Sequence, residues 1–244
     1  MRNKRVFEIG IGRNGVSAGQ PSHFDQVRDL PDVPVISETL LLMELMVRER
    51  TVDLSGISQL VLGDLGAAIQ VLRLAGRETV SFDGLPTRIE DCISGLGMQA
   101  CLEAMSRRTI KRSSRPREMM GAWAHARTVA ENCRLLAEET SFSMNPESAY
   151  LVGLFHSLGS LPAVLGWDRT MQLSGDPDAV GLRLAQAWSL PRCVSEYFTP
   201  SRSIAGANRW REIVRQAHHE SACSLSDQVV QGPSIGSLAH AISS

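Results

Sequence analysis

The chain has 244 residues, with 25 lysines and arginines against 26 aspartates and glutamates, which gives a formal net charge of −1. This balance excludes a global electrostatic field that would attract nucleic acid or an anionic membrane. Hydrophobic residues make up 43% and charged residues 21%, as in ordinary globular proteins, and the length permits one large domain or two small ones.

The cysteines and the apolar segments indicate in which cellular compartment the protein works. The five cysteines are odd in number, widely spaced and free of any C-x-x-C motif, which favours buried reduced thiols over disulfides or a zinc site. They are Cys92, Cys101, Cys133, Cys193 and Cys223. The basic N-terminus has no apolar core of signal-peptide length, and no stretch reaches the roughly 18 uninterrupted apolar residues of a membrane span. We therefore expect a soluble, cytoplasmic protein.

The first 22 residues are Gly-rich and non-periodic, and they predict a flexible N-terminal arm. Within the arm, "GIGRNG" (10–15) matches the G-x-G-x-x-G pattern of dinucleotide-binding turns. That motif requires a preceding strand and a helix that starts inside it, and the following "VSAGQPSHF" is a poor helix. The pattern alone is weak, so an arm is the favoured interpretation.

Residues 23–106 predict an N-terminal helical part. The segment 37–49 is helical by its pattern, with a buried side formed by Leu40, Leu41, Leu45 and Met46. Further helix starts are predicted by caps at Asp53 and Asp64, with Gly63 ending the helix between them, and by a capping box from Thr87 to Glu90.

Residues 107–117 form a basic connector that contains one proline and no acid, and Glu118 follows it directly. Such a connector is either a solvated linker or a docking strip for an acidic partner or a phosphate. Its cations, the candidate partner-binding residues, are Arg107, Arg108, Lys111, Arg112, Arg115 and Arg117.

Residues 118–230 predict a second helical part, followed by a C-terminal tail over 231–244. A continuous apolar stripe runs from Met119 to Ala137, and Asn145 with Pro146 provides a helix start. A helix ends near Trp188 and another restarts at Pro191, before a final amphipathic helix. Because no segment alternates long enough to indicate a strand, we predict an all-α multi-helix bundle.

One histidine lies inside the almost wholly apolar segment "AYLVGLFHSLGSL" (149–161). This residue, His156, is opposite the large apolar side chains on a side of small residues, which predicts a helix buried all round with a neighbouring helix close against it. His125 borders the apolar stripe of the preceding helix. The two histidines could converge as metal ligands or a catalytic base, but a hydrogen-bonded core histidine is the favoured interpretation for each.

The segment "AHHES" (217–221) offers His218, His219 and Glu220. Adjacent histidines on a helix point about 100° apart, so both rarely reach one metal ion. His218 could join a site formed elsewhere, but a polar helix surface is the favoured interpretation.

The ordered set of motifs resembles the HDOD domain, a bacterial family related to the HD and HD-GYP phosphohydrolases. The resemblance runs from about residue 24 to about residue 225. It rests on "LPDVPVISETLLLMELMVRE", "DLSGISQLVLGDLGAAIQVLRLAG", "TRIEDCISGLGMQACLEAM", "AWAHARTVA", "AYLVGLFHSLGSLPAV" and "LRLAQAWSLPRCVSEYF". It implies a single domain over 23–230, with the N-terminal helical part packed on a degenerate HD-like part.

The resemblance also implies where a metal centre would lie. In the catalytic relatives it uses a histidine, a His-Asp doublet and a later aspartate, and the matching positions here are His125, His156 with Ser157, and the final helix. Ser157 replaces the doublet's aspartate, "QAHHESACSL" contains no aspartate, and the G-Y-P tripeptide is absent. A neutral hydroxyl cannot offset the charge of divalent cations, so the resemblance implies vestigial metal positions, no catalytic residues and no cofactor.

We therefore expect a non-enzymatic bacterial signal-transduction module that binds a separate regulatory protein. We expect no membrane partner, and the sequence is compatible with an oligomer. One alternative is a divergent metal-dependent phosphohydrolase that uses His125, His156, His218 and Glu220. A second is a nucleotide sensor that uses the vestigial cleft around the first two histidines.

Overall fold

The computed structural model describes residues 32–49, 53–78, 88–106, 116–139, 144–167, 175–200 and 205–230, with side chains of the last segment described for 208–221. By contact, the chain divides into residues 1–30 and Pro31–Ser244, and every described residue belongs to the second unit. The predicted arm and "GIGRNG" (10–15) thus lie outside the described residues.

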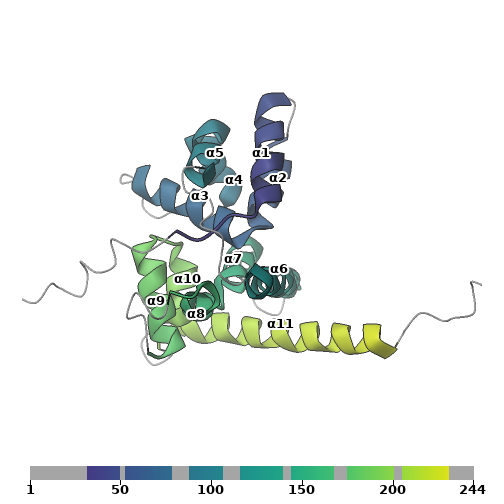
Figure 1. Cartoon of the computed structure of the whole chain (residues 1–244). Helices are drawn as coiled ribbons and strands as arrows, with labels where there is room; N and C mark the ends of the chain where they lie inside the picture. The colour runs from purple at the N-terminus through teal and green to yellow at the C-terminus, as the bar shows by residue number, and fades with distance from the viewer. Residues whose placement is uncertain are drawn as a thin grey trace, which may run out of the picture. The chain divides into compact units, whose positions relative to one another are not determined.

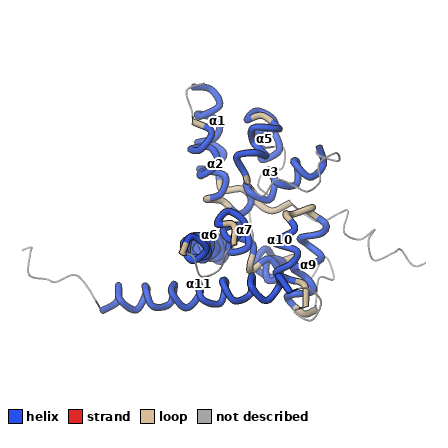
Figure 2. Tube along the Cα trace, turned by 180° about the vertical axis from the view of Figure 1, so that it is seen from behind, coloured by secondary structure: helices blue, strands red, loops and turns tan. Residues whose placement is uncertain are grey.

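The predicted all-α class is confirmed, since the described residues form helices and loops and no strand (Figure 2). The N-terminal part contains α1 (Ser37–Glu49), α2 (Leu54–Leu62), α3 (Leu65–Glu78), α4 (Ile89–Leu96) and α5 (Met98–Ser106). The second part contains α6 (Pro116–Glu138), α7 (Pro146–Phe155), the short 3₁₀ helix η2 (Leu158–Ser160), α8 (Leu161–Leu165), α9 (Pro177–Ala187), α10 (Arg192–Phe198) and α11 (Ala205–Val230).

Helix starts follow the predicted caps. The side chain of Asp53 accepts from the Ser55 amide at 3.2 Å, and that of Asn145 accepts from the Ser148 amide at 2.9 Å, with proline at the first position of α7. These side-chain acceptors satisfy amide groups that have no partner inside the helix. The helix α4 begins after Arg88, whose side chain makes no cap hydrogen bond. Thr87 lies outside the described residues, so the predicted capping box from Thr87 to Glu90 stays a prediction.

The helix α1 buries a different side from the one predicted. Thr39 and Met43 are its buried residues, whereas Leu41 and Leu45 are 57% and 45% exposed. Together with Leu42, which is 48% exposed, these leucines form an exposed apolar face, called here the α1 leucine face.

A buried carboxylate connects the N-terminal part to α6. Asp64 is fully buried and caps α3 by accepting from the amides of Gly66 at 2.9 Å and Ala67 at 3.3 Å. It also accepts from the Ile36 amide at 2.7 Å and from the indole of Trp123 at 3.0 Å. Burial raises the pKa of Asp64, while these donors act in the opposite direction. One side chain therefore joins the segment before α1, the start of α3 and α6.

The helices α6 and α7 pack against each other at the centre of the second part, and α11 packs across α6 and also contacts α7 (Figure 1). Gly153 permits the close approach, because a Cβ atom there would lie 2.6 Å from the Cα of Ala130. Seven of the ten residues of α7 are buried, which confirms the prediction of a helix covered on all sides.

Length and composition alone would allow the segment Pro146–Leu165 to cross a membrane. In the fold this segment is divided among α7, η2 and α8, and 61% of its apolar window is buried inside the protein. Burial of this kind is typical of a core helix.

Candidate functional site

Three histidine side chains from three helices meet in one cluster, called here the histidine cluster. His125 comes from α6, His156 follows the last residue of α7, and His218 comes from α11. One ring nitrogen of each lies within 4.8 Å of the others. The ring centroids are 5.3 Å apart for His125 and His156, 5.0 Å for His125 and His218, and 4.7 Å for His156 and His218.

The packing of α11 on α6 brings the third histidine into the cluster. The amide of Asn132 on α6 donates to the carbonyl of Ala217 at 3.3 Å and to the hydroxyl of Ser221 at 2.9 Å. Ala217 is fully buried at this contact. His218, the next residue along α11, is half-buried and meets the other two histidines, whereas His219 is exposed.

The environment of His156 fixes its protonation. Burial, above all, lowers its pKa to about 4, and the two neighbouring histidines act in the same direction. Its Nδ1 lies 2.7 Å from the carbonyl oxygen of Gly153. Because a carbonyl only accepts, Nδ1 carries the hydrogen in the neutral ring, and Nε2 carries a lone pair.

The same cause acts on His218, whose pKa is lowered by burial and then by the neighbouring His125. His125 is exposed and lies on the solvent side of the cluster. Neutral imidazoles offer lone pairs to an electrophile or a metal ion, and they supply no negative charge.

The structure adds a residue to the candidate site. His125 and His156 lie close together, as the interpretation of them as converging ligands required. His218 joins them, although a polar helix surface was the favoured interpretation for that residue. Glu220 is not a member of the cluster, and neither is any other carboxylate among the residues that the structure describes. These residues do not fit the metal centre that the resemblance implies, because both of its aspartate positions lack a carboxylate.

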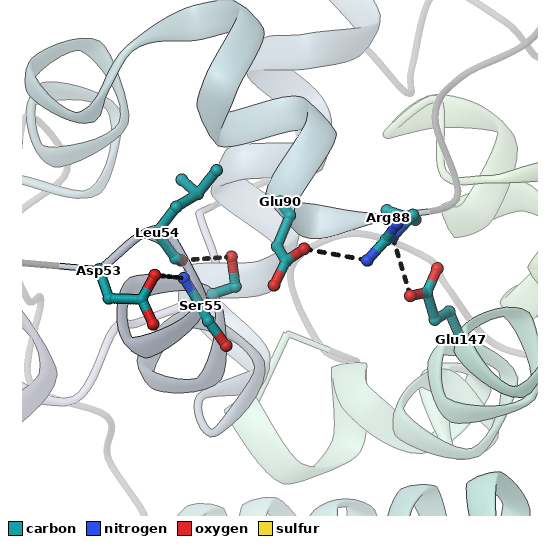
Figure 3. Close-up of polar contacts among 7 residues, drawn as sticks. Asp53, Leu54, Ser55, Arg88, Glu90 and Glu147 are labelled. Atoms are coloured by element: carbon teal, nitrogen blue, oxygen red, sulfur yellow. Dashed lines mark hydrogen bonds and ion pairs between the residues drawn. The ribbon is translucent and has the colours of Figure 1, made fainter.

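A separate cleft of about 860 Å³ lies between α2 and α4 on one side and α6 and α7 on the other. Its lining contains three arginines and three glutamates, so these charges cancel. Arg88 pairs with Glu90 at 3.0 Å and with Glu147 at 2.8 Å (Figure 3). Arg134 pairs with Glu131 at the same cleft. The cleft does not include the histidine cluster, and its balanced charges do not favour an anionic ligand.

The basic connector falls largely outside the described residues. Of its six cations only Arg117 is described, and it is exposed in the first turn of α6. The proposed contact with an acidic partner therefore stays a prediction.

The comparisons with known proteins agree with the fold. The model of the HDOD domain family matches residues 33–175. Comparison with curated protein sequences finds no match. Among solved structures, the MmoQ response regulator from Methylococcus capsulatus str. Bath is similar, with a TM-score of 0.63, 16% identity, and coverage of 80% of this chain and 88% of that chain.

A second similar structure is a virulence factor from Campylobacter jejuni subsp. jejuni, with a TM-score of 0.56, 15% identity, and coverage of 80% of this chain and 78% of that chain. At these identities the two structures speak for the fold alone. The family match covers more than half of the sequence and includes the helices that carry His125 and His156. The chain belongs to the HDOD domain family.

Proposed function

We propose that this protein is a non-enzymatic bacterial signalling module that works in the cytoplasm by binding another regulatory protein. The observation that carries the proposal is the composition of the histidine cluster, which holds three imidazoles and no carboxylate among the described residues. The signalling role is supported by family membership and by the similar structure of a response regulator.

The chemistry of phosphoester hydrolysis argues against the enzyme alternative. A metal-dependent phosphohydrolase uses bound cations to lower the pKa of water and to stabilise charge on the phosphoryl oxygens. Hard cations such as Mg²⁺ and Mn²⁺ require carboxylate and carbonyl oxygens. With Ser157 at the doublet and His218 in the final helix, the cluster has no such oxygen ligand from those positions.

Two surfaces support binding to a protein partner. The α1 leucine face exposes three adjacent large apolar side chains, a feature that marks interaction sites when it is contiguous. The basic connector (107–117) carries six cations, and it would complement an acidic partner surface.

A binding experiment in extracts of the native host tests this proposal. Immobilised protein is compared with a Leu41→Glu/Leu45→Glu variant and with Leu135→Glu, a control that changes a residue of similar exposure, 44%, on α6. We expect a partner to be retained by the wild type and by the control, and to be lost from the double variant. Retention of every captured protein by the double variant would rule out the leucine face.

An activity assay distinguishes the non-enzymatic proposal from the phosphohydrolase alternative. The protein is incubated with an aryl phosphate and with a cyclic dinucleotide in the presence of Mn²⁺, beside a His156→Ala variant. We expect no turnover. Hydrolysis by the wild type that disappears in His156→Ala would overturn the non-enzymatic proposal.

A further inference from the structure

The geometry of the histidine cluster points to a site for one borderline divalent ion, Zn²⁺ or a neighbouring transition metal, held by His125, His156 and His218. The inference does not depend on the protein-binding proposal, because it concerns only these three side chains. It shares His125 and His156 with the carboxylate-based centre that the resemblance implies, but its third ligand is a histidine in place of carboxylates, so it suits a different class of ion.

The distances suit a single small ion. With Zn–N bonds of 2.0–2.1 Å and tetrahedral angles, the ligand nitrogens of a loaded site are about 3.3 Å apart. The three nitrogens here lie within 4.8 Å of one another, so they must close by about 1.5 Å at most. His125 is exposed and can change rotamer to make this adjustment.

The hydrogen bond of His156 prepares it as a ligand. Metal-bound histidines donate their other ring N–H to a carbonyl, a carboxylate or water, which orients the ring and raises its basicity. The contact of 2.7 Å between Nδ1 of His156 and the carbonyl oxygen of Gly153 provides this arrangement and leaves Nε2 to bind the ion.

The ligand set selects the class of metal. Imidazole nitrogen suits zinc, copper, nickel and iron, whereas magnesium, calcium and manganese favour oxygen ligands. Three histidines with a fourth position open to water are a known arrangement for zinc. Because the cluster lies partly open on the side of His125, water can occupy the fourth position.

A bound ion would connect three elements that are far apart in the sequence. His125, His156 and His218 belong to α6, the end of α7 and α11, so the ion would hold α11 on the α6–α7 pair. Because the three histidines meet only in the folded protein, the ion binds that state more tightly than the unfolded chain and stabilises the fold as its concentration rises above Kd.

Metal titration of untagged protein tests the inference, since a polyhistidine tag would bind the same ions. Protein freed of metal with a chelator is titrated with Zn²⁺ and with Mg²⁺ by calorimetry, and thermal unfolding is followed in parallel. We expect one Zn²⁺ per chain, no binding of Mg²⁺, and a Tm increase of about 5 to 10 °C at a hundredfold excess over Kd. Co²⁺ should give the visible absorption of a nitrogen-ligated ion.

Single-residue variants assign the ligands. His125→Ala changes an exposed residue and should leave the fold intact by circular dichroism, while Zn²⁺ affinity falls by more than about 100-fold, beyond the loss that an outer-shell partner causes. His218→Ala should have the same effect. The matched control His219→Ala, which changes the adjacent exposed histidine, should bind Zn²⁺ as the wild type does.

Three results would overturn the inference. They are a wild-type protein that binds no Zn²⁺, a protein that binds Mg²⁺ as tightly as Zn²⁺, and affinities that fall equally in His125→Ala and His219→Ala. None of these results bears on the partner experiment, so the two proposals fail separately.

Discussion

Replacement of Asp64 by asparagine tests whether one buried carboxylate holds the N-terminal part on α6. One of its oxygens, Oδ1, accepts from the amides of Gly66 and Ala67 and from the indole of Trp123, and the other, Oδ2, accepts from the amide of Ile36. Asparagine has nearly the same shape, so the substitution changes hydrogen bonding and charge without leaving a cavity.

The magnitude follows from these contacts. The asparagine oxygen can keep the donors of Oδ1, but the amide NH₂ replaces Oδ2 and faces the Ile36 N–H. This change removes a bond to a charged group, about 1.5 to 3 kcal/mol, and leaves the part-buried Ile36 N–H without its acceptor, about 1 kcal/mol. Burial raises the pKa of Asp64, so loss of the charge returns part of the desolvation cost. We expect the free energy of unfolding to fall by about 2 to 3 kcal/mol.

Urea denaturation followed by tryptophan fluorescence and circular dichroism measures the effect. The matched control is Asp53→Asn, because Asp53 is an exposed helix cap and asparagine caps equally well, so the change should stay within about 0.5 kcal/mol. In thermal unfolding, Asp64→Asn should lower Tm by about 5 to 10 °C. If Asp64→Asn unfolds with the same midpoint as Asp53→Asn, the carboxylate does not connect the two parts as argued.

Three other predictions follow from the core and the cluster. Gly153→Ala forces a Cβ against the backbone of Ala130, so the free energy of unfolding in urea should fall by about 1 to 3 kcal/mol. An unchanged midpoint would show that the close approach of α6 and α7 does not contribute to stability. Ser157→Asp places a carboxylate beside His156 and should create measurable Mn²⁺ binding by calorimetry, whereas no gain would contradict the role assigned to the missing charge. Burial raises the pKa values of the four described thiols to about 11 or 12, which lowers the fraction present as reactive thiolate. A Cys223→Ser variant keeps only these four thiols, and it should resist a thiol reagent up to about pH 9 until urea is added. Rapid labelling of the native variant would refute burial of the four thiols concerned, Cys92, Cys101, Cys133 and Cys193.

Much of the fold could be predicted from local signals. Asp53, Asp64 and Asn145 each precede an apolar periodic segment, and each caps the helix that follows. A cap depends on residues two or three positions apart, so the sequence contains all the information it requires. The further contacts of Asp64 with Ile36 and Trp123 join distant segments, and no local pattern indicates them.

The orientation of α1 could not be predicted for a physical reason. Apolar residues occupy most of its circumference, from Leu40 to Met43 and again at Leu45 and Met46, so periodicity does not determine which side is buried. The tertiary contacts select Thr39 and Met43, and leucines that the pattern assigned to the core remain exposed.

The site shows the same division between local and tertiary information. His125 and His156 were candidates because helical spacing placed each on an inward side of consecutive helices. His218 follows Ala217 on a helix whose register against α6 depends on Asn132, a polar residue that carries no signal by itself. Two imidazoles alone hold a metal ion poorly. The imidazole of His218 on α11 raises the number of ligands to three, but it is neutral too, so the site still has no negative charge. The cluster is therefore unsuited to the hard cations of phosphoester hydrolysis and suited to a single ion that nitrogen ligands can hold.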